Sequence, residues 1–324
     1  MRAVLSHTPG PPSSLVVEEL PDPSPQGDEV VIRVEAAALN FFDTLIIRDR
    51  YQYKPERPFS PGAECSGIVE AVGPDVTRVK PGDRVCAYCT WGACRELVVV
   101  KDRDCIAVPD AVSSDEAAGL IVTYGTTLHA FKDRAGLKEG ESVAVLGASG
   151  GVGLAAVEIA RIMGARVIAC ASSAEKLDMA RQYGAHDFLN YSEEPLKEGL
   201  KSRTDGKGVD VVYDPVGGGF AEQAVRATAW LGRFLVIGFA AGDIPKLPLN
   251  LVLLKGCDVC GVFWGDAVTR DPDGHRANVE QLLNWCADGQ LKPHIGQIVS
   301  LEDVPDAIQT LADRKAVGKI IVRP

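Results

Sequence analysis

A glycine-dense turn between an apolar strand and an apolar-periodic segment constrains this chain more than any other stretch. Residues 143–147 read as a buried strand, and residues 154–163 carry apolar side chains at helical spacing. This order is typical of a phosphate-binding turn, in which backbone N–H groups at the helix start face an anion. The small residues Ala148, Gly150 and Gly153 permit a tight bend, close approach to a pyrophosphate and close packing of helix on strand. The spacing, Ala-x-Gly-x-x-Gly, has alanine in place of the first glycine of the usual motif. By itself it therefore indicates only an α/β crossover that could bind a phosphate.

Strand and turn patterns divide the 324 residues into two domains, since the chain is too long for one compact core. Residues 1–120 alternate short β-like runs with prolines and glycines, which predicts a compact, mostly antiparallel β domain. Over residues 121–265, strands alternate with helical patterns and predict a doubly wound, parallel, six-stranded sheet of the α/β class. Its predicted strands are 143–147, 166–170, 187–191, 209–213, 233–238 and 257–262. Residues 266–324, with a helix at 276–288 and a strand at 318–322, are expected to return to the first domain.

Charge and composition argue against several classes of partner. The net charge of -10, from 34 basic and 44 acidic residues, disfavours broad contact with nucleic acid or an anionic membrane. The N-terminus lacks the apolar core of a signal peptide, and no apolar run approaches the ~20 residues of a membrane span. We therefore expect a cytoplasmic protein whose nine cysteines are reduced.

The segment after the second strand of the predicted sheet indicates which dinucleotide is bound. A site for NADH places an acidic residue about 20 residues past the glycines, where it takes the ribose hydroxyls. Here Ala171, Ser172 and Ser173 occupy that stretch, followed by Lys176. These residues and Tyr191 would receive a 2′-phosphate without repulsion, so we predict NADPH as the cofactor. The serines would also serve as a helix N-cap and Lys176 as a solvated helix charge, and these roles are compatible with phosphate binding.

Several short motifs, in this order and at these separations, resemble the zinc-free NADPH:quinone oxidoreductases related to zeta-crystallin, a branch of the medium-chain dehydrogenases/reductases. The motifs are Ala38–Asp43, Pro61–Glu64, Gly67–Gly73, Lys80–Val85, Tyr124–Thr126, the glycine turn, Asp214–Gly218 and Gly261–Gly265. The resemblance implies a GroES-like β-rich catalytic domain over 1–120, completed by 266–324, with a Rossmann domain inserted over 121–265. It also implies a homodimer that pairs Asp258–Val262 across a two-fold axis, which would cover an apolar edge strand.

The positions that resemble the catalytic zinc ligands of other members carry residues that do not bind zinc. Asn40 stands where those relatives have Cys, and Ala63 where they have His. An amide and a methyl group cannot replace a thiolate and an imidazole around zinc. Residues 120–124, where the third ligand would fall, contain no Cys, His, Asp or Glu. No catalytic metal is therefore expected.

Three cysteines raise the separate question of a structural zinc site. Cys86, Cys89 and Cys94 lie where the relatives have a four-cysteine lobe, but the stretch is too short and no fourth cysteine follows at suitable spacing. We interpret them as inert or oxidisable thiols.

Hydride transfer without a metal suits electrophiles that need little Lewis-acid help, such as quinones and activated double bonds. By resemblance, Asn40, Asp43 and Tyr51 lie on the substrate side, with the Tyr51 phenol as the candidate donor to a carbonyl oxygen. Structural alternatives stay open: Tyr51 as an aromatic rim, Asn40 as a turn residue and Asp43 as the cap of a helix over 44–48.

The cofactor contacts comprise the glycine turn and further positions given by the resemblance. Residues 123–127 are expected in a hinge strand near the nicotinamide riboside, and two later loops near the carboxamide. The predicted contacts are Thr127, Ala148, Ser149, Gly150, Gly151, Val152, Gly153, Ser172, Ser173, Lys176, Tyr191, Gly238, Phe239, Phe263 and Gly265.

The main hypothesis is a zinc-independent, NADPH-dependent reductase of quinones or α,β-unsaturated carbonyl compounds. An enoyl-thioester reductase would keep the same fold, cofactor and Tyr51 donor, and would need a groove for a phosphopantetheine arm. A non-catalytic, crystallin-like NADPH-binding protein is the alternative from another class. A zinc alcohol dehydrogenase is disfavoured by the missing ligands.

Overall fold

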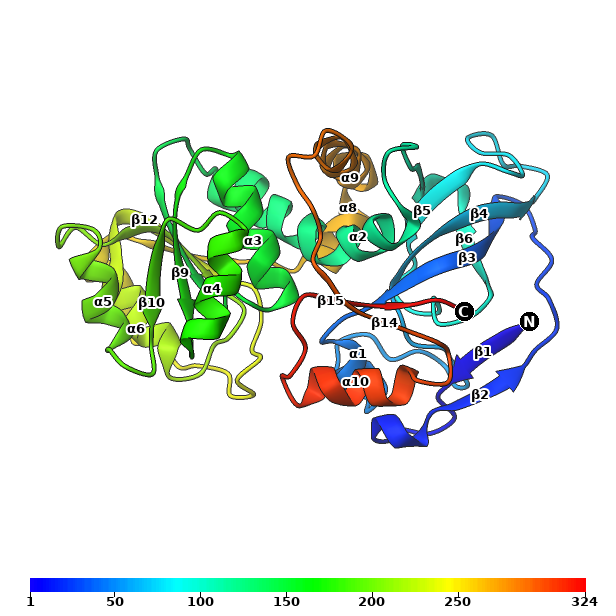
Figure 1. The fold of residues 1–324 in the computed structure, drawn as a ribbon, viewed down its shortest axis with the longest axis horizontal. Coiled ribbons are helices and arrows are strands. Elements are labelled where there is room, and N and C mark those ends of the chain that lie inside the picture. Colours follow the sequence, from blue (N-terminus) through cyan, green and yellow to red (C-terminus); the bar gives the residue numbers. More distant parts are fainter. The chain divides into compact units, whose positions relative to one another are not determined.

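The computed structural model describes residues 1–324, which fold into two compact units (Figure 1). The first unit contains Met1–Gly125 and Ala267–Pro324, and the second contains Thr126–Asp266. The first unit is therefore built from both ends of the chain. No helix in either unit is long and apolar enough to cross a membrane.

A seven-stranded sheet forms the framework of the first unit. Its order is β14-β15-β3-β4-β5-β7, with β6 paired to β3, and β1 and β2 form a separate pair. The strands are β1 (Arg2–Leu5), β2 (Val16–Glu19), β3 (Glu29–Leu39), β4 (Glu64–Val72), β5 (Arg84–Tyr88), β6 (Leu97–Lys101), β7 (Cys105–Ala107), β14 (Ile295–Val299) and β15 (Lys319–Val322). Every pair except β14 with β15 is antiparallel, as predicted for this part of the chain.

The end of the chain completes this sheet. Strand β15 runs antiparallel to β3, with Ile321 opposite Ala38, because both strands present apolar side chains to the same core. Residues 319–322 are therefore part of the sheet of the first unit. The helices of this unit are η1 (Pro12–Ser14), α1 (Asp43–Ile46), η2 (Asp102–Asp104), α9 (Pro272–Ala287) and α10 (Val304–Ala312).

The second unit is a six-stranded parallel sheet with helices on both faces, which confirms the predicted fold class. The strand order is β10-β9-β8-β11-β12-β13. The strands are β8 (Ser142–Leu146), β9 (Arg166–Ala171), β10 (Asp187–Asn190), β11 (Val209–Asp214), β12 (Thr228–Val236) and β13 (Asp258–Gly261). The order reverses between β8 and β11, the position at which doubly wound sheets bind nucleotides.

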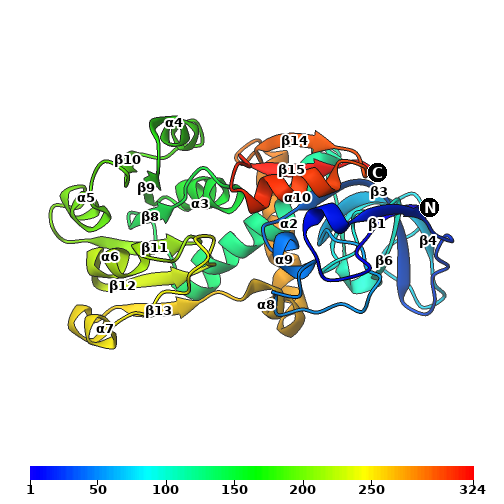
Figure 2. The same ribbon diagram turned by 90° about the horizontal axis from the view of Figure 1, so that it is seen from below.

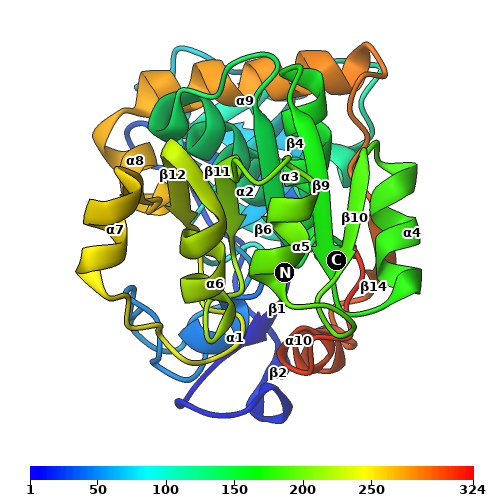
Figure 3. The same ribbon diagram turned by 90° about the vertical axis from the view of Figure 1, so that its left-hand side faces the viewer.

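Helices lie on both faces of this sheet (Figure 3). Buried apolar side chains attach them to it. Helices α5, α6 and α7 share one core with β8, β9 and β11, and α3 and α4 pack on the other face (Figure 2). These helices are α3 (Gly151–Ile162), α4 (Ala174–Gln182), α5 (Leu196–Ser202), α6 (Phe220–Ala227) and α7 (Leu249–Lys255). A further helix, α8 (Trp264–Arg270), follows β13.

The predicted hinge strand over residues 123–127 is wrong, because these residues belong to α2 (Ser114–Leu128), which continues into the π-helix η3 (His129–Ala135). The three threonines and Tyr124 in this stretch favour a strand by propensity. A capping box overrides that preference: Glu116 N donates to Ser113 Oγ at 3.3 Å, and Ser113 N donates to Glu116 Oε2 at 3.0 Å.

Candidate functional site

The predicted cofactor residues of the second unit follow the carboxyl ends of its parallel strands. The glycine turn leaves β8, Ser172 leaves β9, and Tyr191 leaves β10. Gly238 and Phe239 follow β12, and Phe263 and Gly265 follow β13. Because ligands of doubly wound sheets bind outside this edge, the topology brings these positions to the side where a dinucleotide binds.

The glycine turn leaves the first N–H groups of α3 without a side-chain partner. Gly150 is the N-cap residue of this helix and makes no side-chain cap. A Cβ on Gly153 would lie 2.2 Å from the Gly147 carbonyl oxygen, so the close packing of α3 on the turn requires glycine there. Gly147 has a φ of +62°, a left-handed conformation that side chains disfavour. Open amides at the start of a tightly packed helix fit a pyrophosphate.

Three polar side chains converge beyond β9 and β10. Lys176 Nζ donates to Ser172 Oγ at 3.2 Å. Burial raises the pKa of Tyr191, and a hydrogen bond with Ser172 opposes that rise. Ser173 is the N-cap of α4 and accepts from Lys176 N at 3.4 Å, so the cap interpretation is confirmed for Ser173. Ala171, the last residue of β9, is buried, and the strand end carries no carboxylate.

Other predicted cofactor residues have different environments. The Thr127 hydroxyl is fully buried and lies 2.8 Å from the Tyr213 hydroxyl, so this residue contributes to the core of the second unit. Phe239 and Phe263 have exposed side chains. Asp214, at the end of β11, accepts from Val216 N and Gly217 N at 2.8 Å each, which is a strand-end turn.

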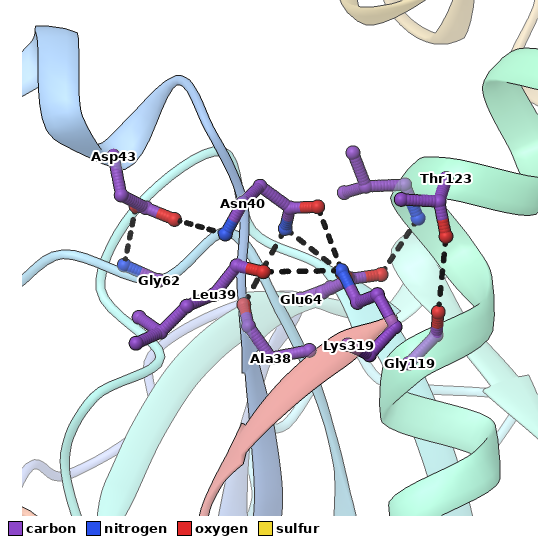
Figure 4. Close-up of polar contacts among 10 residues, drawn as sticks. Ala38, Leu39, Asn40, Asp43, Gly62, Glu64, Gly119, Thr123 and Lys319 are labelled. Carbon is purple, nitrogen blue, oxygen red and sulfur yellow. Dashed lines mark hydrogen bonds and ion pairs between the residues drawn. The ribbon is translucent and has the colours of Figure 1, made fainter. Parts of the chain in front are cut away.

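A buried ion pair occupies the centre of the candidate substrate side in the first unit (Figure 4). Lys319 Nζ, on β15, lies 2.7 Å from Glu64 Oε1 on β4, and both side chains are almost completely buried. The other Glu64 oxygen, Oε2, accepts from Val122 N of α2 at 2.6 Å. The pair therefore joins two strands and a helix.

Asn40, directly after β3, is held by both members of this ion pair. Its Oδ1 accepts from Lys319 Nζ at 2.7 Å, and its Nδ2 donates to Glu64 Oε1 at 2.9 Å. The amide also donates to Ala38 O at 3.4 Å. Asn40 does more than form a turn, because β3, β4, β15 and α2 of the first unit are all held together around it.

The Asp43 carboxylate holds the same loop in place by accepting hydrogen bonds from backbone amides of other residues. Its carboxylate accepts from Asn40 N at 2.7 Å and from Gly62 N at 2.9 Å. Burial raises the pKa of Asp43 to about 6, and these two hydrogen bonds oppose the rise. The interpretation of Asp43 as the helix cap is wrong, because it is the first residue of α1 and the N-cap position belongs to Phe42.

Tyr51 belongs to an aromatic cluster rather than to the polar network. Its ring stacks on Phe42 with centroids 5.1 Å apart and meets the edge of Tyr53 at 5.7 Å. Burial raises the pKa of Tyr51 to about 12, with Tyr53 and Asp43 contributing. The phenol therefore keeps its proton at neutral pH and remains a hydrogen-bond donor.

The sequence prediction did not include Glu64 or Lys319 among the site residues. The signal was present: a charged side chain stands at the buried end of each of two apolar strands, where lysine and glutamate are rare unless paired. Ala63, beside Glu64, is fully buried. No three His, Cys, Asp or Glu side chains are grouped so that they would hold a metal ion.

Two family models match the chain. The alcohol dehydrogenase GroES-like domain matches residues 26–110, and the zinc-binding dehydrogenase model matches residues 151–288.

Similar proteins match nearly the whole chain. Quinone oxidoreductase-like protein 2 of Bos taurus is 38% identical over 309 residues, covering 95% of this chain and 88% of its own length. Acryloyl-coenzyme A reductase of Sulfurisphaera tokodaii is 30% identical over 354 residues, with 100% of both covered. The crystal structure of Escherichia coli quinone oxidoreductase complexed with NADPH superposes with a TM-score of 0.93 at 28% identity, again over 100% of both chains.

Proposed function

Because this chain belongs to the zinc-free quinone oxidoreductase family of the medium-chain dehydrogenases/reductases, we propose that it is a zinc-independent, NADPH-dependent reductase. Its substrates are quinones or carbonyl compounds with an activated double bond. The observation that carries this proposal is Asn40: at a position where zinc-dependent relatives have a ligand, its amide is fully engaged by Lys319 and Glu64.

The residues of the second unit fit NADPH. The open amides of α3 would hold the pyrophosphate, and Ser172, Lys176 and Tyr191 would hold the 2′-phosphate. When bound, the reduced nicotinamide supplies the hydride. The solved relative with NADPH bound supports this assignment.

The first unit supplies a hydrogen-bond donor in place of a Lewis acid. The Tyr51 phenol would donate to the substrate carbonyl oxygen, where negative charge develops as the double bond or quinone is reduced. Its raised pKa keeps the donor protonated, and the Phe42 and Tyr53 rings fix its orientation. The Asn40–Lys319–Glu64 network would hold the neighbouring loop in place.

A second candidate is an enoyl-thioester reductase, favoured by an arginine-lined hollow in the same unit. Arg48 and Arg50 border a hollow of about 290 Å³ together with Pro9, Gly10 and Pro11, directly before Tyr51 in the chain. Guanidinium groups bind phosphates strongly, so this hollow suits the phosphates of a coenzyme A arm. The similarity to acryloyl-coenzyme A reductase points the same way.

Oxidation of NADPH, followed with 9,10-phenanthrenequinone and with a trans-2-enoyl-CoA, separates these functions. We expect turnover of the quinone, and replacing Tyr51 by Phe should lower kcat/KM by about 10- to 100-fold. The matched Tyr53→Phe variant should retain activity. A preference for the thioester by orders of magnitude would favour the second candidate. Tight NADPH binding without turnover of either compound would identify a non-catalytic, crystallin-like binding protein.

The cofactor assignment has its own test in Lys176→Ala. A charged hydrogen bond to phosphate is worth about 1.5–3 kcal/mol, so the Kd for NADPH should rise by about tenfold or more. The Kd for NADH should stay unchanged, since NADH lacks the 2′-phosphate. Equal weakening of both cofactors would contradict the assignment.

Two further properties belong to this proposal. All nine cysteines are free, which fits a reducing compartment, and we place the protein in the cytoplasm. We also propose a homodimer formed through residues 258–262, argued below from the exposed apolar side chains of the second unit.

A further inference from the structure

The loops that follow β9 and β10 stay connected beyond the end of the parallel sheet. Within the sheet, Asn190 is paired in register with Ala171. One residue further on, Tyr191 N still donates to Ala171 O at 3.1 Å. The next contact is made by a side chain, because Ser192 Oγ donates to Ser172 O at 3.0 Å. The loop after β10 therefore holds the loop after β9 through the Ser192 hydroxyl.

The backbone N–H of Ser192 is already engaged in a local turn. It donates to Asn190 Oδ1 at 3.1 Å, which forms an Asx turn directly after β10. The other end of the same amide, Asn190 Nδ2, donates to Glu193 Oε1 at 2.7 Å. Both ends of the Asn190 side chain thus fix the turn, and the hydroxyl of Ser192 is left to reach the neighbouring loop.

The segment that Ser192 holds carries the groups expected to bind the 2′-phosphate. Lys176 Nζ donates to Ser172 Oγ at 3.2 Å. Ser173, the N-cap of α4, accepts from Lys176 N at 3.4 Å. A hydroxyl, an ammonium group and a helix start are all groups that bind phosphate, and here they share one short segment.

Tyr191 is held by a different contact. Its ring lies against that of Phe220, the first residue of α6, with centroids 4.5 Å apart and planes inclined by 46°. A change at Ser192 therefore leaves this support of Tyr191 in place. The contact made by Ser192 acts on the Ser172 and Lys176 side of the phosphate site.

Little else fixes the loop after β9. Ser172 and Ser173 are only partly buried, and Lys176 is exposed. Segments with few buried contacts change conformation at a small cost in free energy. A binding site that adopts its receptive shape only part of the time loses affinity in proportion to that fraction. A hydrogen bond that holds the receptive shape therefore strengthens binding without touching the ligand.

On the basis of the NADPH function proposed above, we propose that Ser192 is a positioning residue for the 2′-phosphate site and a determinant of the preference for NADPH over NADH. Its hydroxyl holds the Ser172 carbonyl and so keeps the Ser172 hydroxyl beside the Lys176 ammonium group. NADH lacks the 2′-phosphate and is held by the glycine turn, so its binding depends little on Ser192.

The test compares the Kd of NADPH with that of NADH, measured by nicotinamide fluorescence in the absence of substrate. Ser192→Ala should raise the Kd for NADPH by about three- to tenfold, the effect of one hydrogen bond, and leave that for NADH unchanged. Ser192→Thr keeps a hydroxyl and should restore most of the affinity. Adenosine 2′,5′-bisphosphate should lose affinity as NADPH does, whereas AMP should behave like NADH.

Ser202→Ala is the matched control, because the Ser202 hydroxyl also donates to a backbone carbonyl, Gly199 O, at 2.9 Å. It should leave the Kd of both cofactors unchanged. Three results would each overturn the role of Ser192: an unchanged Kd for NADPH in Ser192→Ala, an equal rise for both cofactors, or a Ser192→Thr protein that binds NADPH as weakly as Ser192→Ala.

Lys176→Ala, measured alongside, separates an error about Ser192 from an error about the cofactor. If Lys176→Ala weakens NADPH alone and Ser192→Ala does not, the 2′-phosphate site is correct and the role of Ser192 is wrong. If Lys176→Ala weakens both cofactors equally, the 2′-phosphate site itself is wrong, and the role of Ser192 is wrong with it.

Discussion

At the scale of single residues, the buried pair of Lys319 and Glu64 has the largest consequence for stability. Removing one member leaves the other as an uncompensated charge in the core, which typically costs about 3–5 kcal/mol. The cost falls on the first unit, because β15, β4 and α2 all meet at this pair.

We expect Lys319→Met to lower the free energy of unfolding by about 3–5 kcal/mol, measured by urea denaturation. The double variant Lys319→Met with Glu64→Gln should recover part of this loss, since a neutral amide still accepts from Val122 N. Lys315→Ala, which removes an exposed ion pair with Asp313, should change stability by less than about 1 kcal/mol. If the double variant is no more stable than Lys319→Met, the unpaired charge of Glu64 is not the cause of the lost stability.

Asp43 introduces a dependence of stability on pH. Its pKa rises from 3.8 to about 6 on folding, so the folded state binds this proton more tightly than the unfolded state does. Between these values the unfolded state has released more of the proton, and stability therefore falls as the pH rises. The loss is complete about one pH unit above the folded-state pKa of about 6.

We expect this group alone to lower the free energy of unfolding by about 2 kcal/mol between pH 4 and pH 6, because each tenfold difference in proton affinity corresponds to ~1.4 kcal/mol. Asp43→Asn removes the titration, so its stability relative to the unchanged protein should improve across that range. The measurement is the difference between the two proteins in urea midpoint at each pH. A difference that stays constant with pH would show that Asp43 ionises normally.

At the scale of elements, local patterns predicted most strands but not every helix. The strands at 143–147, 166–170 and 209–213 were predictable because β-branched and small apolar residues run between clear turns. The helix over 123–127 was missed because its residues favour strands and its capping box lies ten residues earlier.

The residues of the candidate sites also differ in whether local sequence patterns could predict them. Ser172, Lys176 and Tyr191 lie within twenty residues of one another and follow two strands, so fold topology was enough to place them together. Lys319 and Glu64 are 255 residues apart, and their pairing depends on the C-terminal strand joining the N-terminal domain. No local pattern carries that information.

The packing of α3 on the glycine turn gives a prediction with an internal control. We expect Gly153→Ala to destabilise the second unit by about 1–3 kcal/mol and to weaken NADPH binding, because its methyl group would meet the Gly147 carbonyl oxygen at 2.2 Å. At Gly150 the nearest atom to an added Cβ is 3.6 Å away, an ordinary contact. Gly150→Ala should therefore keep the fold, measured by thermal unfolding. Equal loss of stability in both variants would contradict the packing argument.

At the scale of the whole molecule, the second unit exposes a group of large apolar side chains of a kind that monomeric proteins rarely leave in contact with water. Strand β13 is the last strand of its sheet, and its Val259 is 41% exposed. On α7, Leu249, Leu253 and Leu254 are more than 70% exposed. Trp230, also 71% exposed, lies beside Gly256 at the end of α7. Open edge strands invite pairing with another chain, and exposed apolar patches mark interaction sites.

A second copy of the chain is the partner that this surface suits, since two β13 strands can pair across a two-fold axis and continue the sheet. We expect a dimer of the 34.5 kDa chain in light scattering at micromolar concentration, and a monomer for the double variant Val259→Lys with Leu253→Asp. Each change places a charge where association would bury it, which opposes the dimer without touching the core of the monomer. Ile298→Lys, at an exposed apolar position of β14 in the first unit, should remain a dimer. If the unchanged protein is monomeric at that concentration, this surface is not a self-association site.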